Sequence, residues 1–309
     1  MERLVGSANA EIGMAAGIEI LRGGGSALDV VEAVTRLVED DPDDHTVGYG
    51  GYPNLTGEVE LDASIMDGDT RRTGAVGALL GYRQAITVAR AVMDRLPHVL
   101  VVGDGAARLA AEIGLEPEQL LTEEAERVWR DGLAGRDVDG LAGSMLSMVA
   151  RHVADPERAA GTVDVLARDA RGSIASAVST SGWAWKYPGR LGDSPVIGAG
   201  NYADSRYGAA ACTGWGELAI RAGTARSLVA SMAAGVPLAE ACRLAMADVA
   251  ALDTEGRPPI MSLVALDREG RHAGWSTVAG RTYVFWEHGM TDAEVAARRV
   301  YQPRPVSSP

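Results

Sequence analysis

The stretch GTVDVLARDARGSIASAVSTSG, residues 161–182, decides how this chain is interpreted, because it joins two strand patterns by a turn. Residues 162–168 and 172–179 predict strands, and the residues DARG between them have hairpin-turn chemistry. The first strand begins at a hydroxyl residue, Thr162, directly after Gly161. A buried strand that starts in this way is a candidate functional site as well as a structural element.

The segment before this stretch, residues 151–160 (RHVADPERAA), is charged, contains proline and has no sustained apolar period. It predicts an exposed linker, which is either a domain boundary or an exposed segment ahead of the hairpin. Upstream of it, apolar spacing predicts helices and strands in mixed order. The predicted helices are 13–22, 27–39, 85–95, 105–113 and 122–132, and the predicted strands are 60–66, 73–77 and 98–102.

The GGGS segment before the second helix has two interpretations. It could hold a phosphate at a helix N-terminus, or Ser26 could be an N-cap with Asp29 as its acidic partner. We favour the cap, because no lysine or threonine follows in Walker spacing.

Downstream of the hairpin the pattern predicts long helices between strands. The predicted strands are 207–214, 260–266, 272–277 and 282–285, the helices are 216–233 and 237–253, and the tail 301–309 is expected to be disordered. Antiparallel strands with grouped helices predict an α+β fold, in which helices cover layered sheets.

Composition excludes several functional classes. The 309 residues are 47% hydrophobic and include 38 glycines, which suits a core of closely packed layers. A net charge of −13 argues against a nucleic-acid partner and against an anionic membrane surface. Two cysteines are too few for a disulfide framework, and no signal-peptide or membrane-spanning run is present, so a cytoplasmic location is expected.

Common catalytic signatures are missing from the sequence. HExxH, CxxC and GxSxG do not occur, and the five histidines lack ligand spacing. The acidic residues Asp62, Asp67 and Asp69 could bind a cation, but we favour a solvated turn. We therefore expect neither a metal nor a cofactor.

Chemistry-bearing motifs are concentrated between residues 161 and 217. After Gly161-Thr162 come STSG (179–182), PGRLGDSP (188–195), GAG (198–200) and CTGWGE (212–217). With the earlier segments GGSALD, VGYGG and LDASIMDG, this ordered set resembles the plant-type asparaginase, isoaspartyl peptidase and glycosylasparaginase family over nearly the whole chain.

The resemblance implies a four-layer αββα sandwich of the N-terminal-nucleophile hydrolase type. The chain 1–309 would be one unit that cuts itself at Gly161-Thr162, and the fragments 1–161 and 162–309 would stay together. It also implies a small-molecule β-aspartyl substrate, such as an isoaspartyl dipeptide or the side-chain amide of L-asparagine, and a homodimer of processed units. On this interpretation the linker is not a domain boundary.

Self-cleavage would explain catalysis without histidine. A threonine hydroxyl needs a base to take its proton, and the new α-amine of Thr162 would be that base. Its reference pKa of about 7.7–8.0 leaves it largely neutral near physiological pH. The alternative is that Thr162 is an ordinary β-branched strand residue.

The resemblance assigns supporting roles to three threonines and a glycine. Thr180 would support the nucleophile by hydrogen bonding, Thr46 would be an active-site hydroxyl, and Thr213 and Gly214 would form the oxyanion hole. The alternatives are a turn residue, a strand-end residue and a strand that ends in a glycine turn.

Substrate recognition is assigned to Arg190 and Asp193. The guanidinium fork suits an α-carboxylate and the aspartate suits an α-ammonium. The alternative is a surface ion pair.

Departures from the family pattern bear on the leaving group. Glycosylasparaginases usually carry aspartate where Gly161 stands, and they place a tryptophan in the segment that corresponds to residues 6–9, which has none here. Asp164 stands where the family usually has glycine, which could alter cleavage. Trp183 and Trp185 either shape a leaving-group site or pack in the core.

Three rival functions remain at this stage. The first is N4-(β-N-acetylglucosaminyl)-L-asparaginase, which differs only in the leaving group. The second is a non-catalytic amino-acid-binding relative, and the third is an enzyme that cleaves a larger amide.

Overall fold

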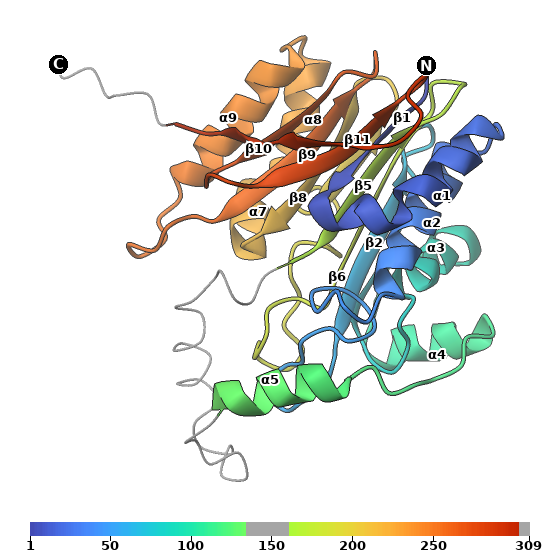
Figure 1. Ribbon diagram of the computed structural model, residues 1–309, viewed down its shortest axis with the longest axis vertical. Coiled ribbons are helices and arrows are strands. Elements are labelled where there is room, and N and C mark those ends of the chain that lie inside the picture. The colour runs from blue at the N-terminus through green and yellow to red at the C-terminus, as the bar shows by residue number, and fades with distance from the viewer. Residues whose placement is uncertain (134–160, 303–309) are drawn as a thin grey trace.

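The computed structural model describes residues 1–133 and 161–302, which form two β-sheets flanked by helices (Figure 1). In the described residues the larger sheet has eight strands in the order β12-β11-β1-β5-β6-β2-β3-β4. Its strands are β1 (Arg3–Ser7), β2 (Leu61–Asp67), β3 (Thr73–Leu79), β4 (Leu100–Val102), β5 (Val163–Arg168), β6 (Ile174–Thr180), β11 (Thr282–Glu287) and β12 (Glu294–Ala297). All its pairings are antiparallel except β3 with β4.

The smaller sheet has the order β13-β10-β9-β8-β7. Its strands are β7 (Asn201–Asp204), β8 (Gly208–Gly214), β9 (Met261–Asp267), β10 (His272–Ser276) and β13 (Arg299–Val300). The two sheets face each other across buried apolar side chains that include Val5, Leu166, Val178, Val264 and Leu266.

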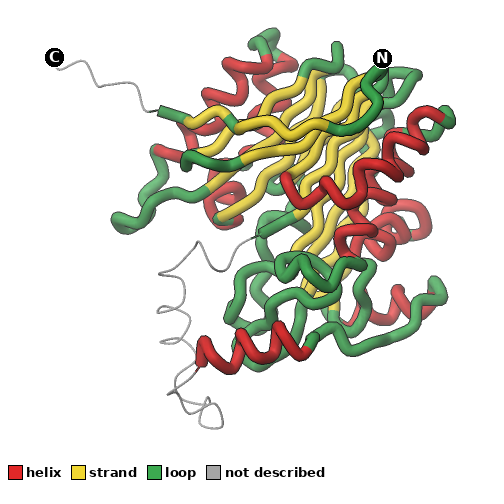
Figure 2. Tube along the Cα trace, in the orientation of Figure 1, coloured by secondary structure: helices red, strands yellow, loops and turns green. Residues whose placement is uncertain are grey.

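Helices cover the outer face of each sheet, so the elements lie in four layers (Figure 2). Against the larger sheet pack α1 (Glu11–Arg22), α2 (Ala27–Glu39) and α3 (Ala85–Arg95), with α4 (Asp104–Glu112) beside β4. Against the smaller sheet pack α7 (Gly216–Ala222), α8 (Thr224–Ala233) and α9 (Leu238–Ala250). A short 3-10 turn (Ala8–Ala10) follows β1, and α5 (Glu123–Leu133) packs on a separate apolar cluster. The predicted α+β fold is confirmed.

Local sequence patterns predicted the bounds of several of these elements. The helices 27–39 and 85–95 have the predicted bounds, and Ser26 caps α2 by accepting a hydrogen bond from the Asp29 amide at 3.1 Å. The hairpin of β5 and β6 is present, with a turn at Asp169–Ser173.

Other predictions were wrong or incomplete. The single helix 216–233 is two helices, because Gly223 adopts a left-handed conformation (φ +58°) that ends α7. Strands β1, β7, β12 and β13 were not predicted, since each is short and lacks an alternating pattern. The predicted linker 151–160 and most of the tail 301–309 lie outside the described residues.

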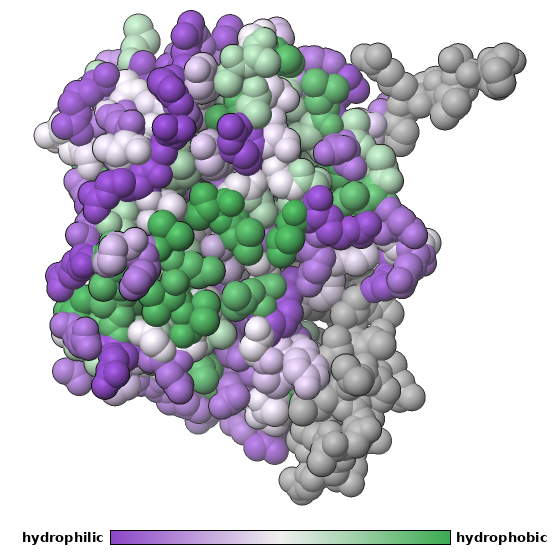
Figure 3. Space-filling model, turned by 180° about the vertical axis from the view of Figure 1, so that it is seen from behind, coloured by the Kyte–Doolittle hydropathy of each residue, from purple (hydrophilic) through white to green (hydrophobic). Residues whose placement is uncertain are grey.

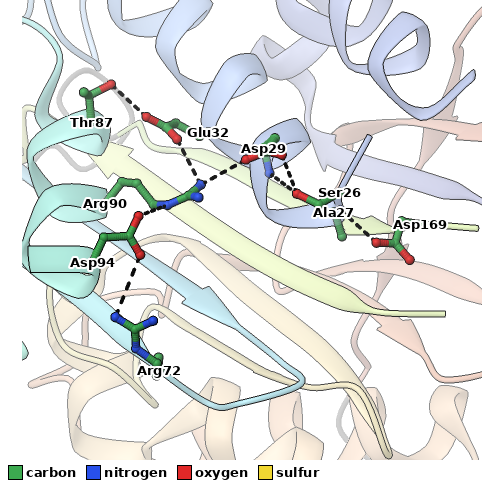
Figure 4. Close-up of polar contacts among 9 residues, drawn as sticks. All are labelled: Ser26, Ala27, Asp29, Glu32, Arg72, Thr87, Arg90, Asp94 and Asp169. Atoms are coloured by element: carbon green, nitrogen blue, oxygen red, sulfur yellow. Dashed lines mark hydrogen bonds and ion pairs between the residues drawn. The ribbon is translucent and has the colours of Figure 1, made fainter. Parts of the chain in front are cut away.

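A charge cluster joins α2 to α3 (Figure 4). Arg90 of α3 bonds Asp94 at 2.7 Å, Glu32 at 3.2 Å and Asp29 at 3.3 Å. Because the arginine is only 22% exposed, these contacts satisfy a largely buried cation and fix the two helices side by side. This helix pair supports the central strands that carry the candidate site.

Figure 3 shows a broad apolar area on the face opposite to that of Figure 1. Exposed apolar side chains include Val99, Leu100 and Val102, on and beside the edge strand β4. Cys212 and Cys242 are buried and free. In the part of the chain that the structure describes, no helix has the length and apolarity to span a membrane.

Candidate functional site

The predicted nucleophile lies where the two sheets come together. Thr162 directly precedes β5, a central strand of the larger sheet, while Thr213 and Gly214 end β8 of the smaller sheet. All three line one cavity of about 410 Å³, together with Gly161 and Thr46. The fold therefore gathers five residues from three segments that are far apart in the sequence around one space.

The peptide bond between residues 161 and 162 is held by a hydroxyl from the neighbouring strand. Thr180, at the end of β6, donates from Oγ1 to the carbonyl oxygen of Gly161 at 2.7 Å. The same hydroxyl accepts from the Gly182 amide at 2.9 Å, which fixes its position. The Gly161 carbonyl is thus polarised by the Thr180 hydroxyl, which is a buried donor. A threonine in an ordinary turn would not supply such a donor.

Thr46 lies against Gly161 in the same bond. A Cβ added at Gly161 would lie 2.3 Å from Cβ of Thr46, so only glycine fits in the present conformation. The Thr46 hydroxyl donates to Oδ1 of Asp44 at 2.5 Å. Thr46 is thereby a fixed member of the site.

A hydrogen-bond chain that the sequence did not reveal continues from Asp44. Asn9 donates to Asp44 at 2.7 Å, Ser7 donates to Asn9 at 2.6 Å, and the Asp164 amide donates to Ser7 at 2.9 Å. The chain joins the loop before Thr46 to the strand that carries Thr162. Asp44 belongs to the run DDPDD (40–44), and the fold brings its carboxylate to Asn9 and to the Thr46 amide.

Gly214 occupies a position that only glycine tolerates. Its φ is +114°, and an added Cβ would lie 2.7 Å from the carbonyl oxygen of Ile260. This residue and its neighbour Thr213 line the cavity across from Thr162. The predicted donors of the oxyanion hole therefore border the same space as the predicted nucleophile.

Asp193 is buried, and Arg190 is partly buried with a side chain that is 17% exposed. The guanidinium of Arg190 donates twice to Oε1 of Glu217, at 3.0 and 2.8 Å, and lies over the ring of Trp183. Asp193 is 5% exposed, and its burial raises its pKa to about 7 although Arg190 opposes the shift. In the sequence, Glu217 is only the last residue of the CTGWGE motif. Its contact with Arg190 is evident only from the tertiary structure.

In the described part of the chain, the predicted recognition residues lie outside the cavity lining. Among the described residues, those that line the cavity do not include Arg190 or Asp193. Arg190 lies instead near Gly182, beside Thr180, and Asp193 interacts electrostatically with Asp164, two residues after the predicted nucleophile.

The two tryptophans after STSG have different surroundings. Trp183 packs against Trp215 with ring centroids 6.0 Å apart and the ring planes tilted by 48°. Trp185 packs in the apolar cluster of α5 and donates to the carbonyl oxygen of Trp129 at 3.2 Å. Core packing therefore accounts for Trp185, while Trp183 contacts Arg190, the predicted recognition arginine.

The acidic residues considered as a cation site serve other purposes. Asp62 is buried in β2 and accepts hydrogen bonds from the amides of Ala78 and Gly192, so the solvated-turn interpretation was wrong for it. Asp67 is the last residue of β2, and Asp69 lies in the turn that follows it, where its amide donates to Oδ1 of Asp67. Within residues 1–133 and 161–302 no group of three or more histidine, cysteine, aspartate or glutamate side chains is arranged to hold a metal ion.

Comparison with known proteins places these residues in a family context. A family model described as "Asparaginase" matches residues 7–296. The chain is 37% identical over 261 residues to an N(4)-(Beta-N-acetylglucosaminyl)-L-asparaginase of Elizabethkingia miricola, covering 83% of this chain and 73% of that protein. It is 39% identical to an isoaspartyl peptidase of Salmonella typhimurium, covering 83% and 80%. It is 38% identical to an isoaspartyl peptidase/L-asparaginase of Mus musculus, covering 74% and 67%.

Proposed function

Because the chain belongs to this asparaginase family, we propose that it is a threonine amidohydrolase that activates itself by cleavage at Gly161-Thr162 and then hydrolyses β-aspartyl amide bonds. Its substrates would be isoaspartyl dipeptides and the side-chain amide of L-asparagine. After cleavage, the fragments 1–161 and 162–309 would remain one folded unit.

The hydrogen bond from Thr180 to the Gly161 carbonyl carries the proposal of self-cleavage. Attack by the Thr162 hydroxyl on this carbon would place negative charge on an oxygen that already has a fixed donor. The Gly161 acyl group would move from the Thr162 nitrogen to its hydroxyl oxygen as an ester. Water would then cleave the ester, leaving a carboxylate on Gly161 and a free amine on Thr162.

The same threonine would then act on substrate. Its new α-amine would take the hydroxyl proton as the oxygen attacks the β-carbonyl, and would return it to the leaving amine. Thr213 and Gly214 would stabilise the oxyanion, while Arg190 and Asp193 would hold the α-carboxylate and the α-ammonium. Hydrolysis of the β-aspartyl ester on Thr162 would complete the cycle.

Glycosylasparaginase activity is the alternative, since one relative carries that name. Two observations favour the smaller β-aspartyl substrates. The contact with Thr46 leaves no room for an aspartate at position 161, and the cavity wall near Ser7 and Asn9 has no tryptophan.

We further propose a homodimer of processed units in the cytoplasm. The exposed apolar residues on and beside the edge strand β4 offer a surface for such an interface. The two free, buried cysteines are consistent with a reducing compartment.

Mass spectrometry of the purified chain tests the central proposal. The wild-type protein should yield two fragments, the second beginning at Thr162, while Thr162→Ala should remain intact. Thr162→Ser, which keeps a hydroxyl, should still cleave. Cleavage of Thr162→Ala at the same bond would indicate a contaminating protease and overturn the proposal.

A substrate panel then separates the activities. The processed enzyme should release aspartate from L-asparagine and from β-aspartyl dipeptides more efficiently than from N4-(β-N-acetylglucosaminyl)-L-asparagine. The reverse order would assign the chain to the glycosylasparaginase alternative.

A further inference from the structure

Two arginines that the proposed mechanism does not use line the cavity beside Thr162. Arg281 immediately precedes β11 and Arg298 immediately follows β12. The Arg298 amide donates to the Arg281 carbonyl oxygen at 2.8 Å, which continues the pairing of Thr282 with Ala297. Because directly opposed residues of paired strands share a face, both side chains border the cavity.

The Arg298 guanidinium is buried and only partly satisfied. The side chain is 7% exposed, Nε donates to the Thr282 carbonyl oxygen at 2.8 Å, and Nη1 is buried without a hydrogen-bond partner in the described part of the chain. Burial lowers the pKa of Arg298, because a guanidinium removed from water loses hydration. Leaving such a group unpaired is costly, so its position calls for a function.

The neighbouring charged residues do not offset the free-energy cost of burying the Arg298 guanidinium with one nitrogen unpaired. Asp164 attracts Arg298, but it is fully buried, neither of its oxygens has a hydrogen-bond partner among the described residues, and burial raises its pKa well above the usual range. Because neither Asp164 oxygen accepts a hydrogen bond from Arg298, this carboxyl compensates the guanidinium only in part. Arg281 adds a like charge on the same cavity wall. An anion bound in the cavity between the two arginines would offset both positive charges.

We propose that Arg281 and Arg298 form a subsite for a carboxylate on the leaving group, so that the preferred substrates are β-aspartyl peptides whose leaving amino acid has a free carboxylate. This inference rests on the proposed function and names its substrate class. A β-aspartyl dipeptide carries two carboxylates. Arg190 takes the one on the aspartyl side, and the arginine pair takes the other. Ammonia and a glycosylamine carry no such group.

The test compares β-aspartyl-leucine, its C-terminal amide and L-asparagine as substrates of the processed enzyme. The wild type should prefer the free acid to the amide by roughly tenfold or more in kcat/KM, as expected for a charge-assisted hydrogen-bonded pair. In Arg281→Gln and in Arg298→Gln the ratio of acid to amide should fall towards one. Arg281 is exposed, so its variant gives a result even if Arg298→Gln fails to fold.

Arg299→Gln is the matched control, because this neighbouring arginine is exposed and does not line the cavity. It should keep the wild-type ratio. A wild-type enzyme that treats acid and amide alike, or an unchanged ratio in active Arg281→Gln, would overturn the subsite and leave the proposed function standing. A processed enzyme that hydrolyses none of the three compounds would overturn the proposed function itself.

Discussion

At the scale of single residues, the bond between Gly161 and Thr162 is enclosed by hydroxyl groups. Thr180 donates to its carbonyl oxygen, and Thr46 touches the α-carbon side of Gly161. Each contact comes from a different segment, so the local environment of the bond is a product of the fold. The donor on the carbonyl is the contact whose removal has the clearest chemical consequence.

We therefore predict that Thr180→Val slows self-cleavage by roughly a hundredfold, the effect typical of removing one oxyanion donor. The change keeps the β-branched shape and deletes the hydroxyl. Thr180→Ser, which keeps the donor, should cleave far faster than the valine variant. The measurement is the rate at which newly synthesised intact chain disappears, followed by mass spectrometry. Equal rates for the valine and serine variants would show that the hydrogen bond plays no part in cleavage.

At the scale of elements, a buried carboxyl joins three of them. Glu39, the last residue of α2, accepts on Oε1 from the Ser179 hydroxyl of β6 at 2.6 Å and from the Ile86 amide of α3 at 2.9 Å. Burial raises its pKa to about 8, and these two hydrogen bonds only partly oppose the shift. We therefore expect the stability of the junction of α2, α3 and the larger sheet to depend on pH.

Whether the free energy of unfolding rises or falls with pH follows from the linkage between proton binding and folding. A carboxyl whose pKa is higher in the folded than in the unfolded chain favours folding when it is protonated. Its contribution is fully present below its ordinary pKa of 4.5 and is lost as pH rises towards about 8. Glu39→Gln keeps an acceptor and carries no charge. In the parent chain, Glu39 should make the free energy of unfolding fall as pH rises from about 5 to about 9. We predict that this fall is smaller in Glu39→Gln by a few kcal/mol.

Urea unfolding of intact chains that carry Thr162→Ala measures this effect without interference from cleavage. Glu19→Gln, an exposed change on α1, is the control and should keep the parent pH dependence. Because Asp193 titrates in the same direction, the difference between variants is the informative quantity. A Glu39→Gln chain with the parent slope would contradict the assignment.

At the scale of the whole molecule, the larger sheet alternates between the two proposed fragments. Strand β1 of residues 1–161 lies between β11 and β5 of residues 162–309, and β6 pairs with β2. Separating the fragments would break three strand ladders and expose the core on both faces of the sheet. Cleavage at 161–162 leaves all of these contacts in place.

We predict that the cleaved fragments elute together from a sizing column in native buffer and separate only in concentrated denaturant. The expected native mass is twice that of one chain, in agreement with the proposed dimer. Intact Thr162→Ala should elute at the same position, since cleavage does not change the fold. Fragments that part without denaturant would contradict both the shared sheet and the single folded unit.

The sequence by itself determined the features that depend on local chemistry. The periodicity of α2 and α3, the Ser26 cap and the hairpin after Gly161 all follow from neighbouring residues, and the ordered motifs identified the family. Helix and turn propensities act over a few residues, so they can be recognised without a fold.

The tertiary structure alone decided which distant groups meet. The hydrogen bond from Thr180 to Gly161, the attachment of Arg190 to Glu217 and the pair of Arg281 and Arg298 at the cavity join segments 17 to 27 residues apart. No periodic pattern encodes such contacts, because they depend on strand order and on the packing of one sheet against the other. The nucleophile can thus be proposed from a motif, whereas the cavity wall opposite it required the fold.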